Sequence, residues 1–128
     1  MSMAYALASP MISSGVSGTE LKASARQLAA GLRKTRSEAI ARRREMTMTV
    51  DVEERNFRLG GESRVYRLPK SVMVQLFTAK SELVTGNVGN IRFFPDGGST
   101  GGRITVSSHE RKYEVDVNWL TGQVSILK

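Results

Sequence analysis

Few residues in this chain of 128 could perform acid–base or metal chemistry. There is no cysteine and one histidine, His109, which stands between a serine and Glu110. A Ser–His–acid triad requires its groups to converge in space, and adjacency in sequence does not supply that convergence. We therefore interpret His109 as a solvated turn residue. The acids Asp51, Glu53 and Glu54 lack the spacing and the glycine of a calcium loop, so we interpret them as a solvated strand end.

Positive charge is the second chemical feature. Nineteen Lys and Arg against twelve Asp and Glu give a net charge of +7. The strongest basic cluster is Arg42, Arg43 and Arg44, with Arg33, Lys34 and Arg36 upstream of it. Arg103 follows a glycine-rich stretch. These arginines could contact the phosphates of DNA or of anionic lipid headgroups. Alternatively, the cluster is a solvated helix end, where cations favour the helix dipole. The residues alone leave both interpretations open.

A glycine-rich stretch between two predicted strands is the third candidate. A phosphate cradle would need Gly-Lys-Ser/Thr between a strand and a helix, and here Arg103 opens a strand instead. We predict a mobile connection that contacts a partner, because such loops often carry binding function. Asp96, just before it, is predicted to bond backbone amides. The residues assigned to partner contact here are Gly97, Gly98, Ser99, Thr100, Gly101 and Gly102.

One long helix must position the basic cluster. Apolar residues recur at spacings of three and four from Thr19, a candidate N-cap, and predict a helix over residues 19–44. No proline interrupts it, and residues 1–18 are expected to form a flexible segment. The apolar stripe is expected to pack partly on the chain's own sheet and partly on neighbouring helices. Its candidate partner-binding residues are Leu21, Ala25, Leu28 and Leu32.

After Glu45 the apolar period changes from 3.6 to 2, which is typical of half-buried strands. Turn signals then separate a series of short strands, and the last two are expected to form a hairpin around Thr121-Gly122. We predict an α+β fold with a single domain over residues 19–128. The strands are expected at 46–52, 56–59, 64–67, 72–77, 91–94, 103–107, 112–119 and 123–127.

Three segments in order resemble a known family. They are ELKASARQLAAGLR at 20–33 with RSEAIA at 36–41, IRFFPDG at 91–97 with STGG at 99–102, and VDVNWLTGQV at 115–124. Together they are similar to the H-type minor pseudopilins of type II secretion, the GspH/FimT family. The resemblance implies a long helix packed on a β-sandwich-like domain of two antiparallel sheets. It also implies a non-enzymatic structural subunit near the tip of the pseudopilus, without metal or cofactor.

Further expectations follow from this resemblance. Such proteins are processed by a prepilin peptidase, methylated at the new N-terminus and anchored in the Gram-negative inner membrane by one apolar helix, with the folded domain in the periplasm. The expected partners are the other minor and major pseudopilins, with the secretin and the exported protein as further candidates. The leader and the apolar helix are missing from this sequence. Residues 1–18 are therefore expected to be what remains after removal of the anchor.

A second branch of the family serves type IV pili and DNA uptake. There a Gly-Arg-x-Arg element in the closing hairpin is associated with DNA binding, and residues 122–125 here read GQVS. The missing arginines argue against DNA binding, whereas the net charge of +7 favours it. The alternative function is therefore a DNA-binding minor pilin whose Arg42, Arg43, Arg44 and Arg103 contact phosphates.

Overall fold

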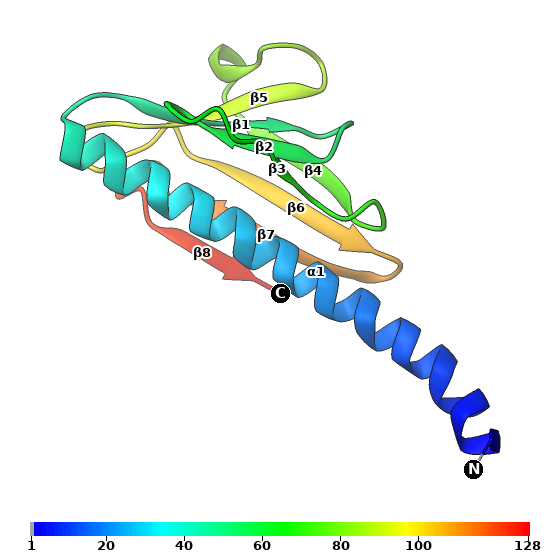
Figure 1. Ribbon diagram of the computed structural model, residues 1–128. Coiled ribbons are helices and arrows are strands. Elements are labelled where there is room, and N and C mark those ends of the chain that lie inside the picture. The colour runs from blue at the N-terminus through cyan, green and yellow to red at the C-terminus, as the bar shows by residue number, and fades with distance from the viewer. Residues whose placement is uncertain (1) are drawn as a thin grey trace.

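The computed structural model describes residues 2–128, with side chains described from Gly18 onward. Within those residues, one helix, α1 (Ser2–Arg42), precedes eight strands in two four-stranded antiparallel sheets. The sheet orders are β3-β2-β1-β5 and β4-β6-β7-β8, so the predicted α+β architecture is confirmed (Figure 1). The bounds are β1 (Met46–Asp51), β2 (Asn56–Leu59), β3 (Tyr66–Arg67), β4 (Met73–Thr78), η1, a short 3-10 helix (Lys80–Glu82), β5 (Val88–Phe93), β6 (Gly102–Ser108), β7 (Arg111–Val117) and β8 (Val124–Leu127).

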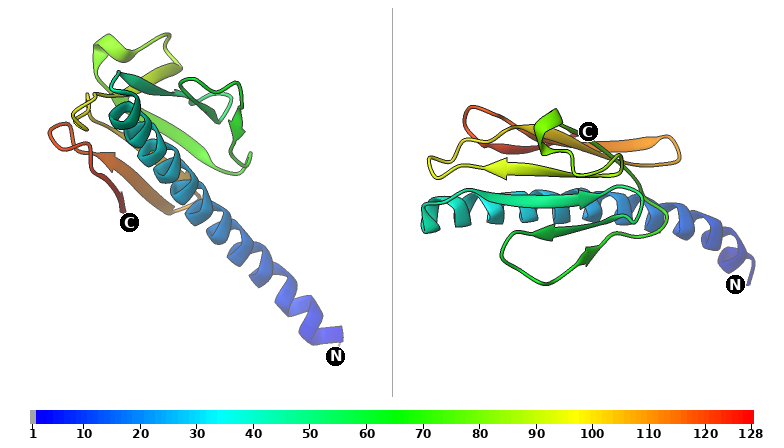
Figure 2. Two further views of the ribbon diagram at one scale, coloured as in Figure 1. Left: turned by 60° about the vertical axis from the view of Figure 1, so that its left-hand side comes forward. Right: turned by 90° about the horizontal axis from the view of Figure 1, so that it is seen from above.

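The helix α1 is about 60 Å long at the usual rise per residue. Its C-terminal part lies along the sheets, and its N-terminal part projects beyond them (Figures 1 and 2). The helix begins at Ser2, so the expected start at Thr19 with a separate segment before it is wrong. Helix propagation is cooperative, and a capping residue such as Thr19 is accommodated inside a helix that continues through it. Within its described residues, α1 contains no stretch that is both apolar enough and long enough to cross a bilayer.

The helix ends two residues earlier than the predicted residue 44. Arg43 has a φ of 56°, in the left-handed region. The N–H of Arg44 donates to the carbonyl oxygen of Ala39 at 3.2 Å. This six-to-one hydrogen bond after a left-handed residue is the Schellman motif, which satisfies a free carbonyl at the helix end. The chain then turns directly into β1.

The core lies between α1 and both sheets. The helix contacts β1 of the first sheet and β6, β7 and β8 of the second, so it closes the space between them (Figure 2). The largest fully buried side chains come from the helix and from both sheets. They are Leu21, Leu28, Leu32, Met48, Val50, Phe57, Val72, Ile91, Phe93, Ile104, Val106 and Val115. Apolar burial on this scale is the main stabilising contribution to the fold.

Most strands fall close to their predicted positions, and the closing hairpin of β7 and β8 is confirmed by the pairing of Val117 with Val124. The largest difference is β5, which begins at Val88 rather than at residue 91. Gly89 occupies an inward-facing, buried position of this strand. Because glycine has no side chain, the apolar alternation is hidden there, and the side chain of Leu76 fills the space.

Candidate functional site

Two loops meet beside the C-terminal turns of α1, and we call them the loop platform: residues 94–101 and residues 118–123. The N–H of Ser99 donates to the carbonyl oxygen of Trp119 at 2.9 Å. Arg36 of α1 joins both loops, because its Nε donates to Gly97 O at 2.9 Å and its Nη2 to Thr121 O at 3.1 Å. The fork of a guanidinium suits such double donation. The helix therefore sets the position of the platform.

The first platform loop is held by hydrogen bonds within the chain, and its predicted mobility stays a prediction. Ser99 Oγ donates to Arg92 O at 2.7 Å and accepts from Gly101 N at 2.9 Å. Thr100 N also donates to Arg92 O, at 3.0 Å. Gly98 N donates to Asp96 Oδ1 at 2.8 Å, which confirms the predicted turn role of Asp96. Buried glycines and internal hydroxyl partners make this a fixed support.

The second platform loop is also fixed, yet it exposes apolar side chains. Asn118 Oδ1 accepts from Leu120 N at 2.8 Å and Thr121 N at 3.1 Å, as in an Asx turn. Gly122 N donates to Asn118 O at 2.7 Å. The side chains of Trp119 and Leu120 nevertheless remain largely exposed. An ordered backbone that presents exposed large apolar side chains is typical of an interaction surface.

The predicted partner-binding stripe on the helix is placed differently from the expectation. Leu21, Ala25, Leu28 and Leu32 are buried within this chain's own core. They contact the sheets and offer no surface to a second helix, so their assignment to neighbouring subunits is corrected. The apolar period identified the buried face of α1, and the chain's own two sheets cover that face completely.

The structure does not bring the four candidate phosphate-binding arginines together. Arg42, Arg43 and Arg44 are exposed at the end of α1, and Arg42 Nε pairs with Glu38 Oε1 at 2.8 Å. Arg103 belongs to β6, where its guanidinium pairs with Asp116 at 3.2 Å and Glu114 at 3.5 Å. These two carboxylates offset the charge of Arg103, because opposite charges at these distances attract each other even at a solvent-exposed site.

Two further helix arginines have structural roles that sequence reasoning missed. Arg33 Nη2 donates to Val124 O at 3.0 Å, and Arg36 holds the loop platform. In the sequence, both belong to the basic cluster of the helix. No local signal identifies such a role, because the acceptors are carbonyls 61 to 91 residues away in the chain. Their charge is therefore committed to internal contacts.

We expect this domain to bind duplex DNA only through weak, non-specific contacts. Arg42, Arg43 and Arg44 are the exposed cluster, and so few phosphate contacts give only weak binding, which salt weakens further. Fluorescence anisotropy of a labelled duplex at about 50 and 150 mM salt measures this. We expect binding to be lost at the higher salt. Tight binding that persists there and disappears when the three arginines become alanine would instead support the DNA-uptake function.

Ion pairs connect outer segments of the chain to α1 and to β5. Lys34 Nζ lies 2.8 Å from Glu62 Oε2, and this hydrogen bond raises the pKa of Lys34 and lowers the pKa of Glu62. Arg92 Nε lies 3.2 Å from the buried Glu82, whose hydrogen bond raises the pKa of Arg92. Arg92 also pairs with Glu45 at 3.2 Å. The pKa shifts of Lys34, Glu62 and Arg92 all favour their charged forms, so these ion pairs act as links.

The residues considered for catalysis or metal binding lie apart from one another. His109 is exposed in the turn between β6 and β7. Asp51 Oδ1 accepts from Glu54 N at 2.9 Å, which closes the turn after β1. Among the residues whose side chains are described, there is no group of three or more His, Asp or Glu that could hold a metal.

A long helix that closes the space between two antiparallel sheets and projects beyond them defines the pilin and pseudopilin class. The minor pseudopilin EpsH from the type 2 secretion system of Vibrio cholerae has this fold, with a TM-score of 0.67 at 15% identity over 84% of this chain and 96% of that chain. The type IV minor pilin FimU of Pseudomonas aeruginosa has a TM-score of 0.66 at 15% identity, over 86% of this chain and 90% of that chain.

Sequence comparison identifies the family within this class. The family model of the type II transport protein GspH matches residues 24–122. The type II secretion system protein H of Xanthomonas campestris pv. campestris is 33% identical over 124 residues, which are 97% of this chain and 73% of that protein. The chain therefore belongs to the GspH family, and the resemblance of its three sequence segments is confirmed.

Proposed function

We propose that this chain is a non-enzymatic structural subunit, a minor pseudopilin near the tip of a type II secretion pseudopilus that helps to export folded proteins across the outer membrane. The observation that carries the proposal is the GspH family match over residues 24–122. A platform held by Arg36 and a helix whose apolar face packs on both sheets agree with a subunit that binds partners without changing shape.

The outer face of α1 is the proposed contact surface for neighbouring pseudopilins. This face is left uncovered by the sheets, and its exposed positions recur every three or four residues. It includes Lys22, Ala23, Arg26, Gln27, Ala30 and Ser37. The three small side chains among them, Ala23, Ala30 and Ser37, recur every seven residues and allow another helix to approach closely there. It takes the place of the apolar stripe, which the domain itself covers.

The proposed location follows from the same role. The sheet domain would lie in the periplasm, with the full-length subunit anchored in the inner membrane by a helix that continues α1. The secretin and the exported protein remain candidate partners of the exposed loops. The DNA-uptake alternative has less support, because Arg103 is paired with Asp116 and Glu114 and residues 122–125 of the closing hairpin lack the two arginines of the Gly-Arg-x-Arg element.

Deleting the gene in the bacterium that encodes this chain tests the proposal. We expect proteins normally exported by type II secretion to accumulate in the periplasm, measured by immunoblotting of the medium and of the periplasmic fraction. Re-introduction of the gene should restore export. Normal export combined with a loss of DNA uptake would contradict the secretion role and favour the alternative.

A further inference from the structure

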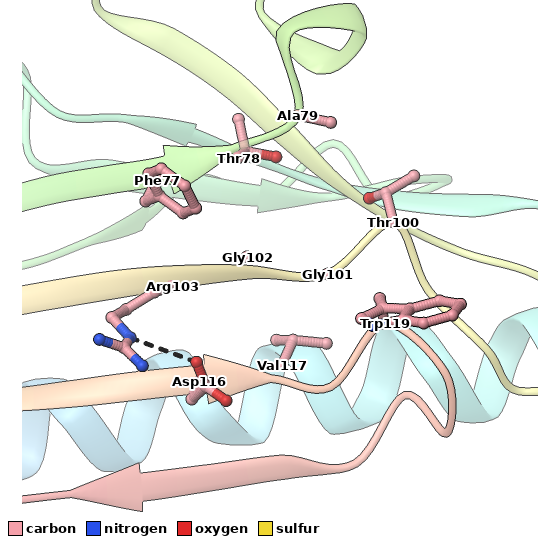
Figure 3. A pocket seen from close by; sticks show the side chains of 10 residues that line it. All are labelled: Phe77, Thr78, Ala79, Thr100, Gly101, Gly102, Arg103, Asp116, Val117 and Trp119. Carbon is pink, nitrogen blue, oxygen red and sulfur yellow. Dashed lines mark hydrogen bonds and ion pairs between the residues drawn. The ribbon is translucent and has the colours of Figure 1, made fainter.

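A groove of about 680 Å³ lies on the outer face of the second sheet, next to the loop platform, where β6 begins (Figure 3). Its walls come from β4 and from the loop after β7, and its floor is the start of β6. Its volume falls in the range of natural ligand sites. The lining residues that carry the argument are Phe77, Thr78, Gly101, Gly102, Arg103 and Trp119.

Two aromatic side chains form the walls. Phe77 is 75% exposed on β4, and Trp119 is 67% exposed on the loop platform. Figure 3 places their rings on opposite sides of the bare Gly101–Gly102 segment. Exposed aromatic rings of this kind supply large contact area at a small entropic cost, and they dominate the energetics of many protein interfaces.

The floor of the groove is bare for a structural reason. A Cβ atom added to Gly101 would lie 2.9 Å from Trp119 Cβ, and one added to Gly102 would lie 2.8 Å from Phe77 O. Both distances are shorter than carbon atoms tolerate, so the close approach of the walls requires glycine at these positions. The result is a flat backbone surface between two rings, onto which a ligand side chain can settle.

The hydroxyl and charged side chains that line the groove have partners within the chain, whereas the indole N–H of Trp119 has none among the described residues and is the one side-chain donor left for a ligand. Thr78 Oγ1 donates to Asn90 O at 2.7 Å, and Thr100 Oγ1 accepts from Arg92 N at 3.2 Å. Arg103 and Asp116 form an ion pair with each other. A sugar needs many free hydrogen-bonding groups, and a phosphate needs an uncompensated cation. The groove therefore favours an uncharged, apolar ligand, although the chain as a whole is strongly basic.

We propose that this groove binds an extended, uncharged and apolar segment of a partner protein, with aliphatic or proline side chains seated between the rings of Phe77 and Trp119. Extended proline-containing segments suit such aromatic-lined grooves, because their backbone is ordered before binding. The inference builds on the proposed function, since it names the surface that a neighbouring or exported protein contacts. Its test uses the purified protein and does not depend on secretion, so either idea can fail alone.

Trp119 is the single tryptophan of the chain, so its fluorescence reports directly on the groove. The probe is a capped heptapeptide of alternating proline and leucine. We expect a blue shift of the emission and protection from acrylamide quenching, with a Kd of about 0.1–1 mM for so short a segment. A glutamate–lysine peptide of the same length and maltoheptaose are expected to leave the emission unchanged.

Two variants on the same strand distinguish binding in the groove from non-specific binding to exposed apolar residues. Phe77→Ala removes one wall but keeps the fluorescent reporter, and we expect it to weaken peptide binding at least about tenfold. Met73→Ala is the matched control, because Met73 is an exposed apolar residue on the same face of β4 that does not line the groove. It should bind as the wild type does. Circular dichroism checks that both variants are folded.

Several outcomes would overturn the proposal. One is an unchanged Trp119 emission at about 2 mM proline–leucine peptide, well above the expected Kd. Another is an equal response to maltoheptaose or to the charged peptide, which would assign the groove to a different ligand class. Equal binding by folded Phe77→Ala would place the site elsewhere. Sedimentation equilibrium that finds a dimer dissociated by Phe77→Ala would make the occupant a second copy of this chain.

Discussion

The Leu28→Asp variant is expected not to fold. Leu28 is fully buried on α1, at the centre of the helix face that both sheets cover. Truncating a buried leucine costs about 2–5 kcal/mol through lost packing. The new carboxylate would be buried in an apolar core, which adds several kcal/mol more. A typical domain is stable by about 5–15 kcal/mol, so the combined loss removes most or all of the stability.

Circular dichroism and urea unfolding measure this effect. Gln27→Asp is the matched control, because Gln27 is the neighbouring residue on the exposed face of α1 and receives the same charge. We expect the control to unfold cooperatively, within about 0.5 kcal/mol of the wild type. A folded Leu28→Asp protein with a wild-type unfolding midpoint would show that the helix face does not pack on the sheets.

The same residue illustrates what periodicity can predict. The spacing of Leu21, Ala25, Leu28 and Leu32 identifies the buried face of a helix, because side chains three and four apart share one face. Periodicity carries no information about what covers that face. The covering elements are β1, which follows the helix directly, and β6, β7 and β8, which lie far away in the sequence. The stripe could therefore be found, while its assignment to a neighbouring helix was wrong.

The exposed and internal roles of the arginines could not be separated from the sequence either. Arg33, Arg36 and Arg42 are equivalent as members of a basic cluster. In the structure, Arg33 and Arg36 donate to carbonyls of the C-terminal half of the chain, whereas Arg42 pairs with Glu38 only four residues away. The local pair follows the rule for helix neighbours at i and i+4. The distant contacts depend on how the sheets fold back along the helix.

The groove could not be predicted from the sequence either. In β4, Met73 and Phe77 face outward while Val74 and Leu76 face the interior, so apolar residues occupy both faces. Alternation of polar and apolar residues, the usual signal of a strand's outer face, is therefore absent. Trp119 comes to the same site from a loop after β7. Only the pairing of β4, β6 and β7 brings these aromatic residues to one surface.

Gly122→Ala is expected to lower the free energy of unfolding by about 3–5 kcal/mol, the second largest effect that we predict. Gly122 has a φ of 74°, where a side chain costs about 1–2 kcal/mol. The added Cβ would also overlap the carbonyl oxygen of Gly97 and lie 2.8 Å from Arg36 Nε. The two platform loops would have to separate, which breaks the part-buried, charge-assisted hydrogen bond between Arg36 and Gly97, worth about 1.5–3 kcal/mol.

Thermal unfolding measures the loss, and we expect the midpoint to fall by about 10–15 °C for a domain of this size. Gly86→Ala is the matched control, because Gly86 lies in an exposed loop with open space around its Cβ position. It should unfold at the wild-type temperature. A wild-type midpoint for Gly122→Ala would contradict the close contact of the two loops.

The Gly122→Ala variant also links the platform to the groove. Trp119 is held by its backbone contact with Ser99, and separation of the loops would remove that contact. We therefore expect the variant, even where it remains folded at low temperature, to move the Trp119 wall and weaken binding of the proline–leucine peptide. Stability and binding would then fall together in Gly122→Ala, whereas Phe77→Ala should lose binding with little loss of stability, since its side chain is mostly exposed. That contrast distinguishes a residue that holds the groove in place, Gly122, from a residue that contacts the peptide, Phe77.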